Sequence, residues 1–243
     1  MKWQIKEGFS AFDFHNHSYY STDSYNEPYR MLKLAKKRGL NGLAFTEHNK
    51  VWKKDKLPRI ENFLVIPGVE VKTLQGEVIG LFVEHHVPKK ISFIETVEMI
   101  HDQNGLVVIP HPFDSIRNKS RLKIEGYSNW KHGYVKISDI KKHVDLIEGF
   151  NARCLRPEFN EIAQEFARKL GKPLTAGSDA HFPWEIASAI TLLPEVESLD
   201  ELREALLKGD QKVFGKPSGY VAHLASFEMK YLRVVLSKFI GEF

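Results

Sequence analysis

Short runs of consecutive apolar residues alternate along the chain with stretches in which apolar residues recur every three or four positions. The short runs predict buried strands, and the longer recurrences predict amphipathic helices. The predicted strands are Phe9–Phe14, Gly42–Phe45, Phe63–Ile66, Glu77–Val83, Leu106–Ile109, Asp145–Phe150, Pro173–Ala176 and Ala189–Leu193. The predicted helices are Pro28–Arg38, Phe93–Gln103, Pro157–Leu170, Leu199–Leu207 and Leu224–Ile240. This alternation, without an internal repeat or linker, favours one domain over residues 1–243 with a parallel α/β core.

Two segments do not follow the simple alternation. Phe113–Lys136 has few apolar and many basic residues, which predicts a long loop over one face of the domain. Residues 224–240 carry apolar side chains at helical spacing. We expect this last helix to dock on the core, and a dimer contact or a membrane-surface role is the alternative.

Composition narrows the class of protein. A chain of 243 residues with 42% hydrophobic content supports a full core, and a single α/β barrel commonly has this size. No apolar run approaches the roughly 18 residues of a membrane span, and the N-terminus lacks the apolar block of a signal peptide. We therefore expect a cytoplasmic protein without a membrane partner. The net charge of +4 would steer an anionic substrate, although a Lys/Glu-rich surface of a robust protein fits equally.

The single cysteine, Cys154, excludes an internal disulfide and a thiolate zinc module, so any metal must be held by histidine and carboxylate. His15 and His17 directly follow the first predicted strand, and residues two apart on an extended segment point to the same side. Such a pair is weak evidence alone. Other apolar runs also end in potential ligands, which are His48, Glu70, His111, Asp179 and His181.

In a parallel barrel or sheet, the carboxyl ends of all strands open onto one rim, where active sites form. Asp179 and His181 repeat the spacing of the first pair, and Glu70 and Asp23 supply carboxylates able to bridge two ions. Nitrogen and oxygen ligands without thiolate suit Zn, Mn or Fe. Two or three such ions, about 3.5–4 Å apart, hold the attacking and leaving oxygens of a phosphoryl transfer. The pattern therefore predicts metal-dependent hydrolysis without a protein nucleophile.

These motifs resemble those of the PHP-domain (polymerase and histidinol phosphatase) metallo-phosphoesterases, in order, from about residue 10 to 193. The matching stretches are Phe12–His17 with Asp23, Thr46–Asn49, Gly68–Glu70 with His111-Pro112, and Gly177–His181. The resemblance implies a distorted (β/α)7 TIM-like barrel with up to three metal ions at the C-terminal rim of its strands, and phosphoester hydrolysis. The residues that fall on the family's ligand positions are His15, His17, Asp23, His48, Glu70, His111, Asp179 and His181.

The sequence departs from the family pattern at two positions. Glu47 stands where the family usually has Asp, and that residue need not be a ligand. Glu77 stands where a His often follows the third motif. Either Glu77 replaces the imidazole as a ligand, which we favour, or one metal position is weak or empty. His85 and His86 predict an exposed loop pair, with contact to metal or substrate as the alternative.

The resulting hypothesis is hydrolysis of a phosphomonoester, nucleotide or short oligonucleotide by a metal-activated hydroxide. Asp179 or Glu70 would bridge the ions, and His181 or His111 would assist the leaving group. Arg117 and Arg153 are the candidate phosphate-binding residues, with a solvated surface position as the alternative for each.

Two other functions compete with this hypothesis. One is a non-catalytic barrel that binds RNA or a protein partner through the basic segment Arg117–Lys136. The other is a metal-dependent amidohydrolase, which is disfavoured because no lysine ends a strand on the predicted rim. No pattern in the sequence indicates the oligomeric state.

Overall fold

The computed structural model describes residues 2–117, 120–127, 133–222 and 225. Its strands are β1 (Phe9–Asp13), β2 (Gly42–His48), β3 (Leu64–Lys72), β4 (Glu77–Leu81), β5 (Leu106–Ile109), β6 (Leu146–Asn151), β7 (Leu174–Gly177), β8 (Ala189–Pro194) and β9 (Lys212–Gly215). Its helices are α1 (Pro28–Lys37), α2 (Phe93–His101), α3 (Ile137–His143), α4 (Pro157–Leu170) and α5 (Leu199–Lys208), with a 3₁₀ turn η1 (Ser115–Arg117).

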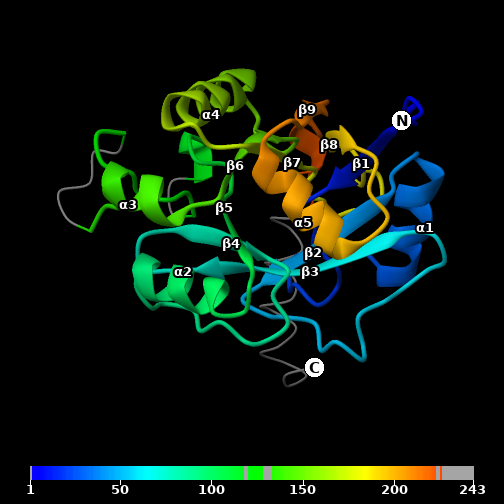
Figure 1. The fold of residues 1–243 in the computed structure, drawn as a ribbon, viewed down its shortest axis with the longest axis horizontal. Coiled ribbons are helices and arrows are strands. Elements are labelled where there is room, and N and C mark those ends of the chain that lie inside the picture. The colour runs from blue at the N-terminus through cyan, green and yellow to red at the C-terminus, as the bar shows by residue number, and fades with distance from the viewer. Residues whose placement is uncertain (1, 118–119, 128–132, 223–224, 226–243) are drawn as a thin grey trace.

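The strands form one sheet in the order β7-β6-β5-β4-β3-β2-β1-β8-β9, which curls into a nearly closed barrel (Figure 1). β1, β2 and β3 are parallel, as are β5, β6 and β7, but β4 lies antiparallel between these groups. β8 and β9 add antiparallel strands beside β1. The TIM-like barrel is thus confirmed, whereas its core is mixed rather than wholly parallel. Residues 73–76 are too few for a crossover connection, so β4 has to turn back beside β3.

The barrel is closed by the residues that follow β1 and β7. His17 N donates to Ala180 O (3.1 Å), and Asp179 N donates to His15 O (2.7 Å). Between them, Asn16 and Ala180 form an isolated parallel bridge. The two stretches of alternating candidate ligands therefore lie side by side, although they are far apart in the sequence.

The inside of the barrel is apolar at the end where β1 begins. Phe12, Ile79, Leu106 and other inward-facing residues form a buried cluster there. α5 lies across this end of the barrel in Figure 1 and contributes fully buried Leu202 and Leu206 to the cluster. Burial of these side chains closes the end of the barrel opposite the predicted rim.

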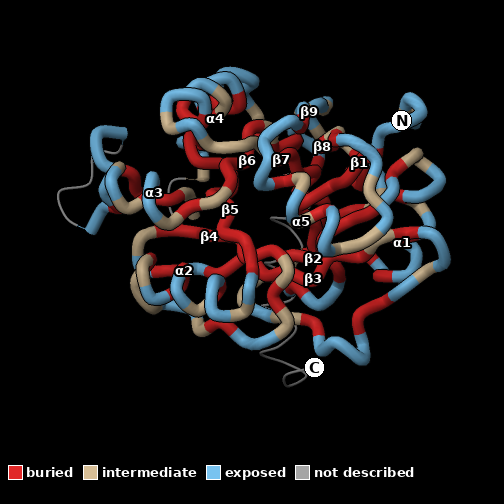
Figure 2. The backbone as a smooth tube through the Cα atoms, viewed as in Figure 1, coloured by how far each residue is buried: buried red, intermediate tan, exposed pale blue. Residues whose placement is uncertain are grey.

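The other helices cover the outer face of the sheet, with their buried sides inward and their exposed sides to solvent (Figure 2). α2, α3 and α4 share one buried cluster with β3 to β6, and α1 shares another with β1 and β2. Local sequence sets the helix ends. Ser92 and Glu95 form a capping box at the start of α2, and Gly171 ends α4 at φ 66°, a conformation that glycine adopts without strain.

The segment Phe113–Lys136 differs from the predicted surface loop. Its described part lacks extended regular structure apart from η1, but Phe113, Leu122 and Ile124 are buried in the cluster beneath α2 and α4. α3 and β9 were not predicted, because short elements carry little periodicity. The predicted helix 224–240 lies outside the described residues. Among the residues that are described, no helix is long and apolar enough to cross a membrane.

Candidate metal centre

The predicted ligands gather at the barrel rim, where β1, β2, β3, β5 and β7 end. Among the described residues, three overlapping groups of donor atoms are found, each with its atoms within 4.8 Å of one another. The groups are His15, Glu70 and His111; His15, His17 and Asp179; and His17, His48 and His181. All of these residues are buried except His48, whose side chain is 29% exposed. His15 and His17, which follow β1, thus connect all three groups, because each belongs to two of them.

Hydrogen bonds fix the orientation of three imidazoles. His15 Nδ1–H donates to Glu148 Oε1 (2.9 Å), and His181 Nδ1–H donates to the Asp179 carbonyl (2.8 Å). His17 Nδ1–H donates to Ser21 Oγ (3.2 Å), since that hydroxyl gives its own proton to Glu47 (2.6 Å). In its neutral form, each ring therefore presents an Nε2 lone pair to the cluster.

The donor set fits metal ions. The Nε2 atoms of His15 and His17 lie 3.1 Å apart, and Asp179 Oδ1 lies 3.7 Å and 3.4 Å from them. Lone pairs and carboxylate oxygens repel at such distances unless a cation or a proton lies between them. Nitrogen and carboxylate oxygen in this arrangement match the preferences of Zn, Mn and Fe.

Glu70 stands between two of the ligand groups. Its Oε1 lies 3.2 Å from His111 Nε2 and 3.5 Å from His15 Nε2. Its Oε2 lies 2.8 Å from His48 Nδ1 and 3.6 Å from His17 Nε2. The two carboxylate oxygens therefore face different sets of imidazoles, which is the geometry of a bridging ligand.

Asp23 reaches the same rim from the loop after β1. Its Oδ2 lies 3.4 Å from His48 Nε2, and its Oδ1 lies 3.6 Å from His181 Nε2. The His17 and His48 rings stack with centroids 4.2 Å apart, so all four side chains converge. Asp23 thus lies beside His48 and His181 of the third group.

Glu77 reaches the rim because β4 is antiparallel. It begins β4 opposite Lys72, the last residue of β3. Its Oε2 lies 3.8 Å from His111 Nε2, and the side chain is nearly buried. His111 Nδ1 is buried without a hydrogen-bond partner, so the ring is held mainly from its Nε2 side. The structure thus brings Glu77 to the first ligand group.

The same strand direction carries His85 and His86 away from the rim. Both follow the end of β4, which pairs with the start of β5, and both are exposed. The exposed loop pair is confirmed, and the alternative of contact with metal is wrong. The reason is that residues after an antiparallel strand lie at the opposite end of the barrel from those after its parallel neighbours.

Glu148, which the sequence motifs do not indicate, contacts two of the candidate ligands. It is 2% exposed on β6, where it accepts hydrogen bonds from His15 Nδ1, from the His111 amide (2.7 Å) and from Asn151 Nδ2 (3.0 Å). A carboxylate that holds the far nitrogen of a ligand histidine orients the ring and raises its basicity. The available signal was an acidic residue inside the apolar run Leu146–Phe150.

Glu47 supports one of the ligands indirectly, through Ser21. This fully buried carboxylate accepts hydrogen bonds from Ser18, Ser21 and Trp52 rather than facing the cluster. Ser21 in turn accepts from His17, so Glu47 holds the hydroxyl that orients this ligand. The departure from Asp in the second motif thus falls on a supporting residue.

Backbone geometry at the site is equally specific. A Cβ at Gly177 would overlap the side chains of His15 and Glu148, so only glycine allows their close approach. His111 and Asp179 adopt φ values of 30° and 52°, in a region that non-glycine residues rarely occupy. Such strain is tolerated where the surrounding structure fixes a functional side chain.

Electrostatics keep the carboxylates ionised. Burial alone would raise the pKa of Glu70, but the adjacent His15 and His111 outweigh it and hold this pKa well below its usual range. For Asp179, Arg117 and His15 outweigh burial in the same direction. Burial, with the positive charge of Arg153, lowers the pKa of His181 well below its usual range. In the opposite direction, nearby carboxylates outweigh burial at His15 and His48 and hold the pKa of each imidazole well above its usual range. Ionised carboxylates and neutral imidazoles are the forms that bind metal, so these two rings would release their protons as metal binds.

The two candidate phosphate-binding arginines differ in position. Arg117 pairs with Asp179 and with Asp114 (3.2 Å), and its side chain is 20% exposed at the edge of the cluster. Arg153 is buried, with Glu185 at 3.2 Å and the Ala222 carbonyl at 2.8 Å. Neither is a freely solvated surface arginine.

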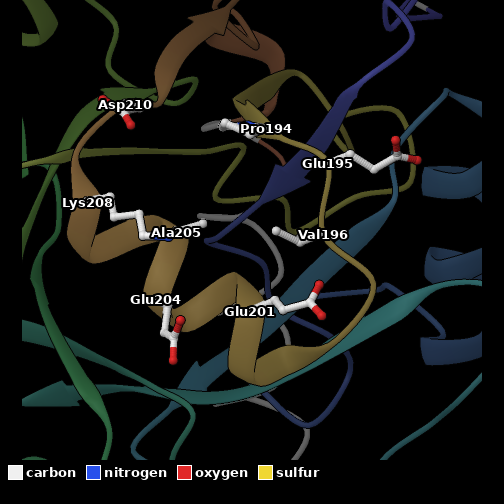
Figure 3. Close-up of a pocket in the computed structure, with 8 residues that line it drawn as sticks. All are labelled: Pro194, Glu195, Val196, Glu201, Glu204, Ala205, Lys208 and Asp210. Atoms are coloured by element: carbon white, nitrogen blue, oxygen red, sulfur yellow. The ribbon is translucent and has the colours of Figure 1, made fainter.

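A separate hollow of about 270 Å³ lies at the opposite end of the barrel. Its lining includes Pro194, the last residue of β8, which pairs with Phe9 at the start of β1. Figure 3 shows that its acidic side chains spread around α5 instead of pointing toward one another. This hollow therefore has no part in the metal centre.

The fold and the rim define a class of protein, an α/β barrel whose strand ends carry a cluster of histidine and carboxylate side chains that fits metal ions. The family model of the PHP domain matches residues 13–174, and that of the PHP-associated region matches residues 157–210. The chain therefore belongs to the PHP-domain family, as its motifs indicate.

Three relatives extend this comparison. The uncharacterized protein MJ0417 of Methanocaldococcus jannaschii is 31% identical over 242 residues, which cover 94% of this chain and 95% of the relative. A two-domain protein from Bacteroides vulgatus containing a predicted PHP-like metal-dependent phosphoesterase has a TM-score of 0.66 at 18% identity, over 94% of this chain and 73% of that chain. PsfC from Pseudomonas syringae has a TM-score of 0.64 at 16% identity, over 94% and 99%. The two solved structures show the shared fold.

Proposed function

We propose that this protein is a metal-dependent phosphoesterase that hydrolyses a phosphomonoester, a nucleotide or a short oligonucleotide. The observation that carries the proposal is the convergence of three imidazole Nε2 lone pairs on a cluster that also contains Glu70 and Asp179. Membership of the PHP family and the phosphoesterase named among the solved relatives support it.

The site's own residues divide the work. His15, His17, Asp23, His48, Glu70, Glu77, His111, Asp179 and His181 would hold two or three Zn, Mn or Fe ions. Ions at such a site supply Lewis acidity and an activated water. Glu70 is the better bridging candidate because its two oxygens face different imidazole groups. Glu77 offers the first group a further carboxylate, with its Oε2 3.8 Å from His111 Nε2.

The substrate-facing roles follow from exposure and charge. Arg117 is the better placed phosphate-binding residue, since its guanidinium reaches Asp179 and remains partly exposed. Arg153 is buried and acts on the site through the pKa of His181. His181 or His111, beside the bound ester, would assist the leaving group, and Asp179 would help to hold the ions.

The main alternative is a non-catalytic barrel that binds RNA or a protein partner through Arg117–Lys136. Loss of ligands is expected of such a protein, whereas here the predicted ligands converge. The amidohydrolase alternative expects a lysine among the ligands. Contrary to the expectation from the sequence, Lys72 does end β3 at the rim, but it is exposed, whereas the clustered ligands are buried or half-buried. A cytoplasmic location remains a prediction from the sequence.

The test measures bound metal and hydrolysis together. The purified full chain should contain at least one equivalent of transition metal by elemental analysis. It should hydrolyse a generic aryl phosphate or a dinucleotide, with activity lost on chelation and restored by Zn²⁺ or Mn²⁺. Less than one equivalent of metal, together with no hydrolysis after metal is added, would refute the proposed phosphoesterase function.

Asp179→Ala is the site variant, and Asp102→Ala is its matched control. Asp179 is buried against two imidazoles, so its loss should abolish measurable hydrolysis and reduce the metal content. Asp102 is exposed at the end of α2, and its variant should retain full activity. Unchanged activity in Asp179→Ala would refute the site assignment even if hydrolysis itself stood.

A further inference from the structure

Exposed aromatic side chains lie close in sequence to two ligands of the candidate metal centre. Tyr20 and Tyr25 belong to the loop that carries Asp23, and Trp184 follows His181 by three residues. Single exposed aromatic residues are ordinary on protein surfaces. These differ because each is part of a stack or cluster of rings joined to residues that hold the ligands.

The first face consists of Tyr20 on Trp52. Their rings stack with centroids 4.2 Å apart and planes at 22°. Trp52 is buried and donates its Nε1–H to Glu47 (3.1 Å), whereas Tyr20 is 37% exposed. The Lys50 ammonium lies 6.0 Å from the Tyr20 centroid. An aromatic ring beside a cation is the combination that single-stranded nucleic acid sites use.

The second face consists of Trp184 on Phe182, with Tyr25 beside them. The indole and phenyl rings are nearly parallel, at 6°, with centroids 4.6 Å apart, and Tyr25 lies 5.9 Å from Phe182. Phe182 is buried and directly follows His181, while Trp184 is 54% exposed. A buried ring thus supports an exposed one next to a ligand.

Both faces are tied to the metal centre through one loop. Asp23 lies between Tyr20 and Tyr25 in the sequence, and Tyr25 N donates to the His181 carbonyl (2.9 Å). Ser24 Oγ donates to the His17 carbonyl (2.7 Å). The backbone that places Asp23 among the ligands therefore also places the aromatic rings at the edge of the cluster.

We propose that Tyr20 and Trp184 stack on nucleobases, so that the phosphoester presented to the metal centre belongs to a nucleotide or to a short single strand. This inference rests on the proposed phosphoesterase function and narrows its substrate class. Every base has a π face, so stacking binds bases without requiring one sequence. A sugar phosphate without a base gains nothing from these faces.

The test compares substrates that differ only in the base. Adenosine 5′-monophosphate and ribose 5-phosphate share the phosphate and the sugar, and a dinucleotide adds a second base. In the metal-loaded full chain, Tyr20→Leu and Trp184→Leu should each lower kcat/KM at least about 5-fold on base-bearing substrates. The same variants should leave ribose 5-phosphate hydrolysis unchanged. Phe9→Leu, an exposed aromatic at the start of β1, is the matched control and should change neither.

A binding measurement separates the two levels of the proposal. The anisotropy of a fluorescein-labelled tetranucleotide should report weaker binding to Tyr20→Leu and Trp184→Leu than to the unmodified chain or to Phe9→Leu. If this holds while no ester is hydrolysed, base stacking stands and the phosphoesterase function fails. Greater loss on the dinucleotide than on the mononucleotide supports a strand as substrate, and equal loss supports a mononucleotide.

Two results would overturn base stacking while leaving the phosphoesterase intact. One is equal kcat/KM for the mononucleotide and ribose 5-phosphate, unaffected by either substitution. The other is a lowered melting temperature in both variants with unchanged tetranucleotide binding, which would assign these rings to packing within the chain.

Discussion

The two ends of the barrel are built on opposite principles. At the end where β1 begins, α5 covers the opening and buries Leu202 and Leu206 against apolar residues of the strands. At the other end, ionisable side chains are buried at close range, and His111 and Asp179 hold strained backbone conformations. Apolar burial stabilises a fold, whereas buried charge and strain oppose it. The comparison indicates that apolar burial at one end offsets the cost of buried charge and backbone strain at the other.

The strongest test of this division is a cavity beneath α5. Leu206→Ala removes a fully buried side chain from the interior cluster, and large-to-small substitutions of this kind cost about 2–5 kcal/mol. We expect the free energy of unfolding in denaturant to fall by that amount. Metal content and hydrolysis per folded molecule should remain those of the unmodified chain.

A different result would break the division. If Leu206→Ala lost metal or activity at temperatures where it is fully folded, the two ends would be coupled through the barrel interior. Leu207→Ala is the matched control, because Leu207 is 43% exposed on the same helix. Its stability should change by well under 1 kcal/mol.

The second test acts at the rim without removing a ligand. Glu148→Gln keeps the size of the side chain but replaces an oxygen with an amide NH₂. Glu148 now accepts hydrogen bonds from His15 Nδ1–H and from the His111 backbone N–H. In the variant, the NH₂ group would face one of these two donors and could not accept its hydrogen bond. Residues that orient ligand histidines typically contribute 10- to 100-fold to metal affinity or activity. We expect a loss in that range, measured by competition with a chelator and by hydrolysis.

The effect of a chelator on the melting temperature should also distinguish Glu148→Gln from the unmodified chain. Metal that binds only the folded state raises the melting temperature, so EDTA should lower it in the unmodified chain and less in Glu148→Gln. Glu165→Gln, at an exposed position on α4, should behave as the unmodified chain. Equal metal affinity in Glu148→Gln and Glu165→Gln would show that His15 needs no carboxylate partner.

The sequence was sufficient to predict that most of the candidate ligands lie together, and the reason is physical. Ligands such as His15 and His17 follow directly after apolar strands, and strand ends in a barrel share one rim. The alternation of side chains then turns residues two apart toward the same point. Local pattern and fold class thus combine to place residues that are distant in the chain, as with Asp179 and His181.

Other parts of the site depended on tertiary structure. Glu148 meets His15 across 133 positions of sequence, and only the packed barrel shows that it supports a ligand. The direction of β4 decides that Glu77 lies at the rim and that His85 does not, and apolar pattern alone does not reveal strand direction. The stack of Tyr20 was missed for the same reason, because its supporting ring, Trp52, comes from another segment. The stack of Trp184 was missed although Phe182 is only two residues away.

The smallest expected effect concerns the start of α5, the helix that covers the apolar end of the barrel. Ser198 caps this helix by accepting a hydrogen bond from Glu201 N (3.2 Å). Ser198→Ala removes the cap and should cost about 1 kcal/mol, which lowers the melting temperature by about 2–4 °C. Ser198→Asp should retain most of the lost stability, because aspartate caps equally well. Hydrolysis should be unchanged in both variants, and reduced activity in Ser198→Ala alone would show that the order of α5 reaches the metal centre through the barrel.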